Sequence, residues 1–324
     1  MRGKMDCFGI TDAGLKRPLN EDQFLIADLN KAMRIHQSSL SVDDDETVFG
    51  GSQGMMLLVA DGMGGHAHGE QASRLAVESL TSSILNTMPW FFSRDAEGDE
   101  DLRQSLERAL ERCQERLQDE AAQQTGARGM GTTLTAAYIH WPRTTILHAG
   151  DSRCYLLRDG VLTQITNDHT MAAALSQGGR YKSSELAHTR WAHMLWNAIG
   201  SGDAKVQPEV HQFDLRIGDV LLLCTDGLIR HVGPGELEEA LSRPRLASET
   251  CAELVKLTNA RGGTDNVTVV VARFLDQDEP DGRAAAAAIA QQQSEEADRA
   301  DSLSDTAPEI PVIPAESTLP LQNG

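Results

Sequence analysis

Residues 55–62 read Met-Met-Leu-Leu-Val-Ala-Asp-Gly, an apolar run that ends in an aspartate followed by a glycine. A short apolar run bounded by a turn signal is typical of a buried β-strand. The same arrangement returns in Ile-Leu-His-Ala-Gly-Asp151-Ser152 and in Leu-Leu-Leu-Cys-Thr-Asp226-Gly227. A fourth aspartate, in Gly-Gly-Thr-Asp265-Asn266, comes directly before an apolar run. The sequence therefore predicts a core of buried strands whose ends carry aspartates.

These four carboxylates are expected to meet at one edge of the sheet system, because each stands at a strand end. Like charges in a partly dry site repel one another by several kcal/mol unless a cation neutralises them. Hard divalent cations with oxygen ligands, Mg²⁺ or Mn²⁺, meet this need, and a glycine beside an aspartate lets a backbone carbonyl approach the ion. A single Asp-Gly pair is usually only a turn. The recurrence of the pattern, joined by Glu21-Asp22, predicts a metal centre.

Size and charge restrict the class of protein. The chain has 324 residues, enough for a large core, and its 48 acidic and 29 basic side chains give a formal charge of −19. This charge argues against nucleic acid and against an anionic membrane surface as partners. The longest apolar runs fall short of the roughly 18 to 20 residues of a membrane-spanning helix, and no signal-peptide pattern is present. Five cysteines without a Cys-x-x-Cys pair indicate reduced thiols, so a cytoplasmic protein is expected.

Short β-type runs are spread along residues 5–275, whereas helical patterns come in pairs. Adjacent strands joined by hairpins, with helices arriving in pairs, indicate an antiparallel α+β fold and disfavour a Rossmann-type nucleotide fold. Helices are expected over residues 70–87, 101–122, 236–242 and 248–260. Strands are expected over residues 7–11, 22–29, 55–60, 132–140, 145–148, 153–158, 161–165, 210–215, 220–225 and 267–274.

Three segments lack these patterns and are expected to be loops: residues 30–53, 90–101 and 167–203. The composition then changes after residue 275. Residues 276–324 contain 11 acidic and 2 basic side chains, an alanine run and a proline-rich end. So little of this segment can be buried that chain entropy is expected to keep it disordered. We therefore predict a folded domain over residues 1–275 and an acidic, disordered tail over residues 276–324.

Seven motifs follow one another between residues 6 and 274. They are Arg17-Pro-Leu-Asn20-Glu21-Asp22, Asp61-Gly62-Met63-Gly64-Gly65-His66, Gly131-Thr132-Thr133, Gly150-Asp151-Ser152-Arg153, Asp168-His169-Thr170, Gly218-Asp219-x4-Cys224-Thr225-Asp226-Gly227 and Gly263-Thr264-Asp265-Asn266. In this order and spacing they resemble the bacterial form of the metal-dependent Ser/Thr protein phosphatases of type 2C, the PPM family. The resemblance implies an α-β-β-α sandwich of two antiparallel sheets flanked by helix pairs. It also implies that residues 1–275 are the catalytic domain and that residues 167–203 are its flap insertion.

By position, the resemblance implies a centre of two Mn²⁺ or Mg²⁺ ions. Asp61 would bridge both ions, and the backbone carbonyl of Gly62 would bind one of them. Asp226 and Asp265 would bind the other. Asp151, together with Asp226, resembles the ligands of a third, weaker site.

Three further residues complete the implied site. Glu21 and Asp22 would hold metal-bound waters, and Arg17 matches the position that binds the substrate phosphate, where a planar guanidinium suits a phosphoryl dianion. A hydroxide bridging the two ions would then hydrolyse phosphoserine and phosphothreonine, with Arg17 and Asp61 as catalytic residues. The implied partners are phosphorylated proteins, among them a bacterial Ser/Thr kinase, and a monomer is expected.

The residues leave other functions open. A phosphatase of one dedicated regulatory phosphoprotein or of a small phosphate ester would use the same side chains, and a non-catalytic binding module could keep the same fold. A P-loop nucleotide site is disfavoured, because no Gly-x4-Gly-Lys-Ser/Thr is present. Trp191 and Trp196 lie in the expected flap, where polar and basic residues are common among relatives, so the substrate preference stays open.

Ending the chain at Asp276 tests the prediction for the tail. Because the residues beyond it have almost nothing to bury, the shortened protein is expected to melt within a few degrees of the full chain and to keep its activity on an aryl phosphate. Calorimetry and a para-nitrophenyl phosphate assay measure the two quantities. A melting temperature lowered by more than about 5 °C would show that the tail packs against the domain.

Overall fold

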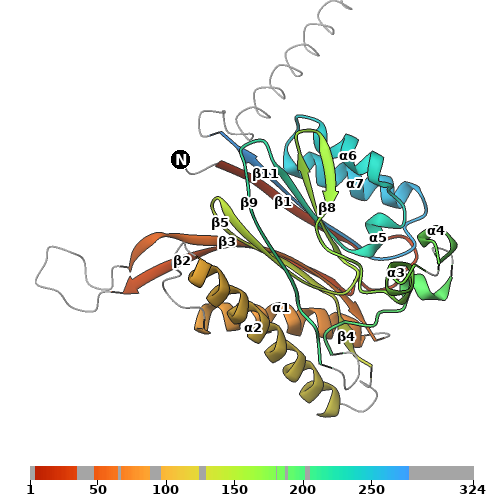
Figure 1. Cartoon of the computed structure of the whole chain (residues 1–324), viewed down its shortest axis with the longest axis horizontal. Helices are drawn as coiled ribbons and strands as arrows, with labels where there is room; N and C mark the ends of the chain where they lie inside the picture. Colours follow the sequence, from red (N-terminus) through yellow and green to blue (C-terminus); the bar gives the residue numbers. More distant parts are fainter. Residues whose placement is uncertain are drawn as a thin grey trace, which may run out of the picture. The chain divides into compact units, whose positions relative to one another are not determined.

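The structure, a computed structural model, describes residues 4–34, 47–64, 67–87, 96–123, 129–179, 181–186, 189–200 and 205–276. Within these residues two antiparallel sheets lie face to face, and each carries a pair of helices on its outer face (Figure 1). The predicted α+β class and its α-β-β-α layers are therefore confirmed. In the described part of the chain, no helix is long and apolar enough to cross a membrane.

The first sheet has the strand order β1-β11-β10-β7-β8. Leu222 of β10 packs toward the helices α6 and α7, whereas Leu221 and Leu223 pack toward the second sheet. Successive side chains of a strand point to opposite faces, so a strand covered on both sides is apolar at every position. The elements are β1 (Lys4–Asp12), β11 (Val267–Leu275), β10 (Val220–Cys224), β7 (Arg153–Arg158), β8 (Val161–Gln164), α6 (Pro234–Ser242) and α7 (Ala247–Ala260).

The second sheet has the order β2-β3-β5-β6-β9, with β4 paired to the end of β3. Leu58 of β3 packs under α1 and α2, and its neighbours Leu57 and Val59 pack against the first sheet. The apolar run of β3 thus joins two layers of the core. The elements are β2 (Asp22–Arg34), β3 (Thr47–Met63), β4 (Gly131–Thr132), β5 (Leu134–His140), β6 (Arg143–Ala149), β9 (Glu209–Asp214), α1 (Ala67–Thr87) and α2 (Ala96–Gln123).

Two of the loop predictions are wrong in part. Residues 30–34 and 47–53 lie in β2 and β3, and residues 96–101 lie in α2. Between residues 47 and 54, β3 pairs with β2 alone, because its pairing with β5 is confined to residues 55–59. Figure 1 shows the described part of this strand pair projecting past α1 and α2. A strand pair without a covering layer needs no apolar pattern. The remaining parts of these predicted loops lie outside the described residues.

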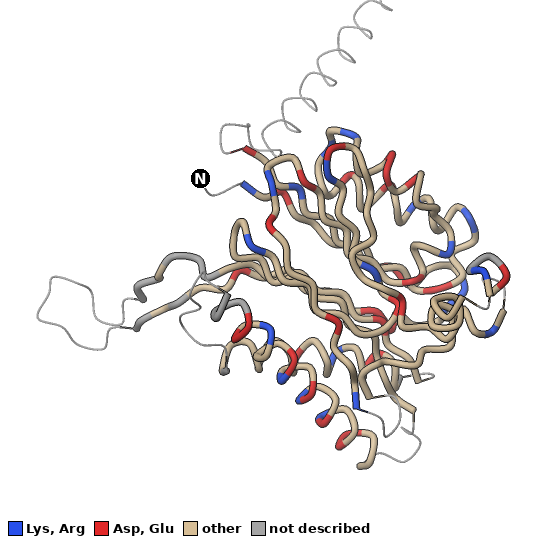
Figure 2. Tube along the Cα trace, viewed as in Figure 1, with Lys and Arg blue, Asp and Glu red and all other residues tan. Residues whose placement is uncertain are grey.

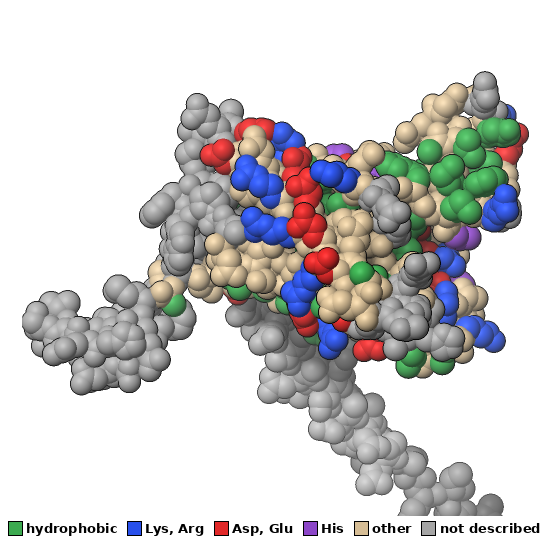
Figure 3. All heavy atoms as spheres, turned by 90° about the horizontal axis from the view of Figure 1, so that it is seen from below, with side chains coloured by type: hydrophobic (Ala, Val, Ile, Leu, Met, Phe, Trp, Pro, Cys, Tyr) green, Lys and Arg blue, Asp and Glu red, His purple; other side chains and the backbone are tan. Residues whose placement is uncertain are grey.

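The expected flap, residues 167–203, also contains helices that the sequence patterns do not predict. These are α3 (Met171–Gln177), α4 (Ser183–Leu186) and the 3-10 helix η1 (Arg190–His193). Each is too short to show a helical repeat. Large apolar side chains of this segment are exposed, namely Tyr181, Met194 and Trp196, and Figure 3 shows hydrophobic side chains gathered on the side where Figure 1 has α3 and α4. The predicted tail beyond Asp276 lies outside the described residues, so the domain boundary stays a prediction.

Candidate metal centre

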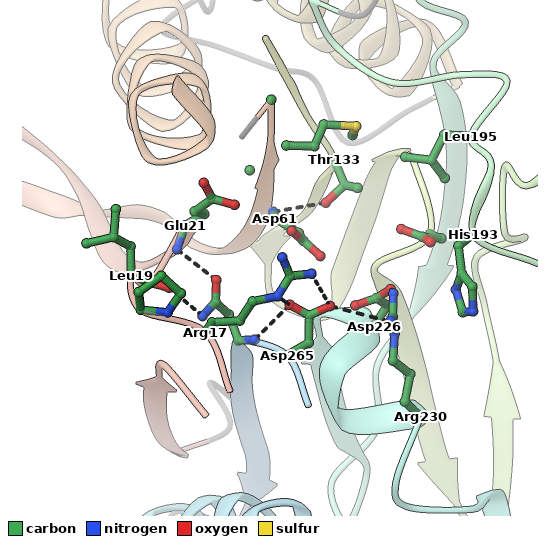
Figure 4. A pocket seen from close by; sticks show the side chains of 16 residues that line it. Arg17, Leu19, Glu21, Asp61, Thr133, His193, Leu195, Asp226, Arg230 and Asp265 are labelled. Carbon is green, nitrogen blue, oxygen red and sulfur yellow. Dashed lines mark hydrogen bonds and ion pairs between the residues drawn. The ribbon is translucent and has the colours of Figure 1, made fainter. Parts of the chain in front are cut away.

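A cavity of about 410 Å³ lies where strand ends from both sheets meet (Figure 4). Figure 2 shows acidic positions at the ends of the central strands, near the short helix α5 (Asp226–Ile229). The cavity is lined by almost all the residues that the sequence singles out: Arg17, Glu21, Asp61, Gly62, Asp151, Asp226 and Asp265. The fold therefore brings together side chains that are up to 248 positions apart in the chain.

Asp22 lies behind this cavity, paired with Asp61 across β2 and β3. Its Oδ2 atom accepts hydrogen bonds from the hydroxyls of Thr225 (2.8 Å) and Thr268 (2.7 Å). Among the described residues, its Oδ1 atom is buried with no hydrogen-bond partner. Burial raises the pKa of Asp22 to about 7, despite these two hydrogen bonds. An orphaned carboxylate oxygen at this depth fits a water or cation as its partner.

The carboxyl groups around the cavity are difficult to ionise together. Burial, followed by the charges of Asp22 and Asp226, raises the pKa of Asp61 well above its usual range. Burial and the charge of Asp226 raise the pKa of Asp151 to about 8. Burial also raises the pKa of Asp226. The ionised forms of these buried carboxyl groups are unfavourable without a positive charge nearby. Their oxygen atoms are suitable ligands for one or more divalent cations, which would supply that charge.

The backbone of Asp61 is held by the Gly131-Thr132-Thr133 motif. The amide of Thr133 and the hydroxyl of Thr132 both donate to the Asp61 carbonyl at 2.9 Å. The hydroxyl of Thr133 accepts from the Asp61 amide at 3.0 Å. These bonds fix the direction in which the Asp61 side chain leaves β3, which gives this motif a structural role.

Gly62 stands where no side chain fits. A Cβ atom at this position would lie 2.0 Å from the carbonyl oxygen of Gly69 in α1 and 2.7 Å from that of Glu21. The Gly62 amide donates to the Glu21 carbonyl at 3.1 Å. The glycine therefore brings the end of β3, the start of α1 and the segment before β2 into close contact.

Asn266 is a residue of the site whose role the sequence reasoning missed. Its side-chain oxygen accepts from the Glu21 amide at 2.9 Å, and its amide group donates to the carbonyls of Ala13 (2.9 Å) and Leu19 (2.8 Å). These bonds attach the segment that carries Arg17 and Glu21 to the strand start that carries Asp265. The Asp-Asn pair before an apolar run was the available signal, because asparagine can bond several backbone groups of a turn.

Two arginines lie against the acidic residues. Nε of Arg17 is 2.7 Å from Oδ1 of Asp265 and its Nη2 is 3.0 Å from Oδ2, so the predicted phosphate-binding arginine here binds a predicted metal ligand. Arg230, which the sequence reasoning missed, binds Asp226 through two of its nitrogens. Arg230 could have been found from its position four residues after Asp226, because side chains four residues apart on a helix lie next to each other.

A second cluster joins the flap to the loop of Asp151. The ligand atoms of His148, His169 and Glu209 lie within 4.8 Å of one another. His169 Nδ1 accepts from the Gly150 amide at 3.2 Å, and its Nε2 lies 2.9 Å from a carboxylate oxygen of Glu209. His148 bonds the Thr135 hydroxyl and the Asn167 carbonyl. Because both nitrogens of each ring have protein partners, the cluster is a structural network.

Comparison with known proteins gives consistent matches. A family model described as protein phosphatase 2C matches residues 33–299. The serine/threonine protein phosphatase PstP of Mycobacterium tuberculosis is 36% identical over 250 residues, which are 77% of this chain and 46% of that protein. This chain therefore spans about half the length of PstP. The serine/threonine phosphatase stp of Listeria monocytogenes is 33% identical over 216 residues, which are 67% of this chain and 83% of that protein.

A solved structure has the same architecture. The crystal structure of the PstP catalytic domain in complex with two manganese ions superposes with a TM-score of 0.63 at 32% identity. The match covers 84% of this chain and 99% of that one.

The buried His148 predicts a pH dependence of stability. Burial, followed by the charge of His169, lowers its pKa from 6.5 to about 4, so the folded state holds it neutral. Below pH 6.5 the unfolded chain binds a proton at this histidine, whereas the folded chain does not until about pH 4. The unfolding free energy is therefore highest above pH 6.5 and falls by up to about 3 kcal/mol as the pH decreases toward 4. Replacing it in His148→Gln, whose amide can keep both hydrogen bonds, should flatten the loss of unfolding free energy over this range in urea titrations. Equal slopes for both proteins would contradict this assignment.

Proposed function

Because the chain belongs to the protein phosphatase 2C family, we propose that it hydrolyses phosphoserine and phosphothreonine in proteins and so opposes a Ser/Thr kinase. The observation that carries the proposal is the convergence of carboxylates from both sheets on one cavity, with an arginine at its rim. The cavity opens to the surface, so a phosphorylated side chain on a protein can enter it.

The donor set supports a centre of two Mn²⁺ or Mg²⁺ ions. Asp61 would bridge them, the Gly62 carbonyl would bind one, and Asp226 and Asp265 would bind the other, as the resemblance implies. Glu21 and the buried Asp22 would hold waters of the centre. Divalent ions in this position supply Lewis acidity, which acidifies water and neutralises charge on a phosphoryl group.

Arg17 is proposed to bind the phosphate. Its side chain is 49% exposed, whereas that of Asp265 is 14% exposed, and it already lines the cavity, so its guanidinium can exchange the carboxylate for a phosphoryl group there. A guanidinium presents two parallel N–H donors, which match two oxygens of a phosphoryl group. An ion held by Asp265 would compete with Arg17 for this carboxylate and favour that turn.

The proposal also includes the substrates, location and oligomeric state that are expected from the sequence. The substrates are phosphorylated proteins, including a bacterial Ser/Thr kinase, and the protein acts as a cytoplasmic monomer without nucleic-acid or membrane partners. A phosphatase of one dedicated phosphoprotein or of a small phosphate ester, and a non-catalytic binding module, are the alternatives. The intact set of Arg17, Asp61, Asp226 and Asp265 favours catalysis over the binding module.

Asp226→Asn tests the proposal, with Asp214→Asn as the matched control on an exposed ion pair with Arg143. Turnover of a phosphothreonine peptide should disappear with chelator, return with Mn²⁺, and fall on the order of 100-fold or more in Asp226→Asn, because one ion loses a ligand. Asp214→Asn should keep the wild-type rate. Full activity of Asp226→Asn at saturating Mn²⁺ would refute the proposed centre, and hydrolysis of small esters alone would favour that alternative.

A further inference from the structure

Arg230 places a fixed positive charge inside the acidic cluster. It stands four residues after Asp226, so both side chains lie on the same face of the turn formed by α5. Its Nε atom donates to Asp226 Oδ2 at 3.0 Å, and its Nη2 atom donates to the same oxygen. Its Nη1 atom lies 3.4 Å from Oδ2 of Asp265 (Figure 4). One guanidinium thus contacts two of the proposed metal ligands.

The position of Arg230 coincides with the side of the centre where a third ion is expected. A second cavity, of about 520 Å³, adjoins the first, and the two share Asp151, His193, Asp226 and Arg230 as lining residues. Asp151 and Asp226 are the residues that resemble a third, weaker site. The charge of Arg230 acts on both of these carboxyl groups and opposes the rise of their pKa values.

Arg230 differs from Arg17 in how firmly it is held. Its side chain is 31% exposed, against 49% for Arg17. Its backbone amide donates to the Asp226 carbonyl at 3.1 Å, which keeps the two residues together. A cation four residues along the same helical turn stays within reach of its carboxylate, whereas Arg17 reaches Asp265 from a separate segment.

We propose that Arg230 is a resident cation at the Asp151–Asp226 side of the centre, and that it excludes a third metal ion there. The inference rests on the proposed two-ion phosphatase and narrows it. Both hydrogen bonds of Arg230 go to Oδ2 of Asp226, so Oδ1 can still bind the second main ion. A third divalent ion on the Asp151 side would have to share Oδ2 with the guanidinium, and it would meet that positive charge at contact distance. Arg230 is therefore a positioning residue, which acts through Asp226 and sets the number of ions.

Counting bound ions tests this directly. Equilibrium dialysis of the full chain against Mn²⁺, followed by metal analysis, should give two ions per chain for the wild type. Arg230→Met keeps the aliphatic stem but removes the charge, so it should give three. Adding Asp151→Asn to Arg230→Met should return the count to two, because the third site loses a ligand. Arg230→Lys, which keeps a cation, should remain at two.

The control is Arg243→Met, which removes an arginine that also pairs with a carboxylate four residues before it, Glu239. Neither residue lines the two cavities. It should bind two ions like the wild type. A wild type that binds three ions would overturn the inference whether or not the variants fold. A count of two in a folded Arg230→Met, shown by an unchanged circular dichroism spectrum, would overturn it as well. A wild type that binds no ion would instead refute the proposed function.

Discussion

Repulsion among carboxylates at the shared edge of the two sheets is the interaction on which the site depends. Asp22, Asp61, Asp151 and Asp226 all have pKa values raised chiefly by burial, and further by the charges of neighbouring aspartates, including Asp265. A flexible chain would relieve such repulsion by moving the groups apart. Here each group is attached to a strand end, and the strands are held by three apolar layers of core. Because the packed strands hold these carboxylates close together, a divalent cation that neutralises their charge is bound favourably.

Local backbone contacts turn this general arrangement into a defined geometry. Thr133 fixes the direction of Asp61, and Asn266 ties the Arg17 segment to the start of β11. Two glycines allow the close approaches, since a Cβ atom on Gly227 would lie 1.9 Å from the Asn266 carbonyl oxygen, and Gly62 is similarly confined. The network of His169 connects the flap to the loop of Asp151, because the Gly150 amide donates to His169.

The sequence predicted the features that repeated apolar patterns of buried elements reveal. The apolar runs and paired helical patterns predicted an antiparallel α+β fold, and the aspartates beside those runs predicted a shared acidic cavity. The four layers and the place of Arg17 were implied by the resemblance to the phosphatase family. The extension of β2 and β3 was missed because a two-stranded ribbon without a covering layer needs no apolar pattern. The helices of the flap were missed because each is four to seven residues long. The roles of Asn266 and Arg230 depend on which backbone and carboxylate oxygens lie nearby in three dimensions. The Asp265-Asn266 pair and the spacing of Arg230 from Asp226 were the signals visible in the sequence.

The unfolding free energy of Asp61→Asn in the presence of chelator tests the central claim most directly. A carboxyl group whose pKa is raised in the folded state destabilises that state at every pH above its unfolded pKa. Replacing it with a neutral amide should therefore stabilise the metal-free protein at pH 7. Addition of Mn²⁺ should then stabilise the wild type much more than the variant. An Asp61→Asn protein that is less stable than the wild type in chelator would contradict the account, because it would mean that burying the Asp61 carboxylate among its acidic neighbours does not destabilise the fold.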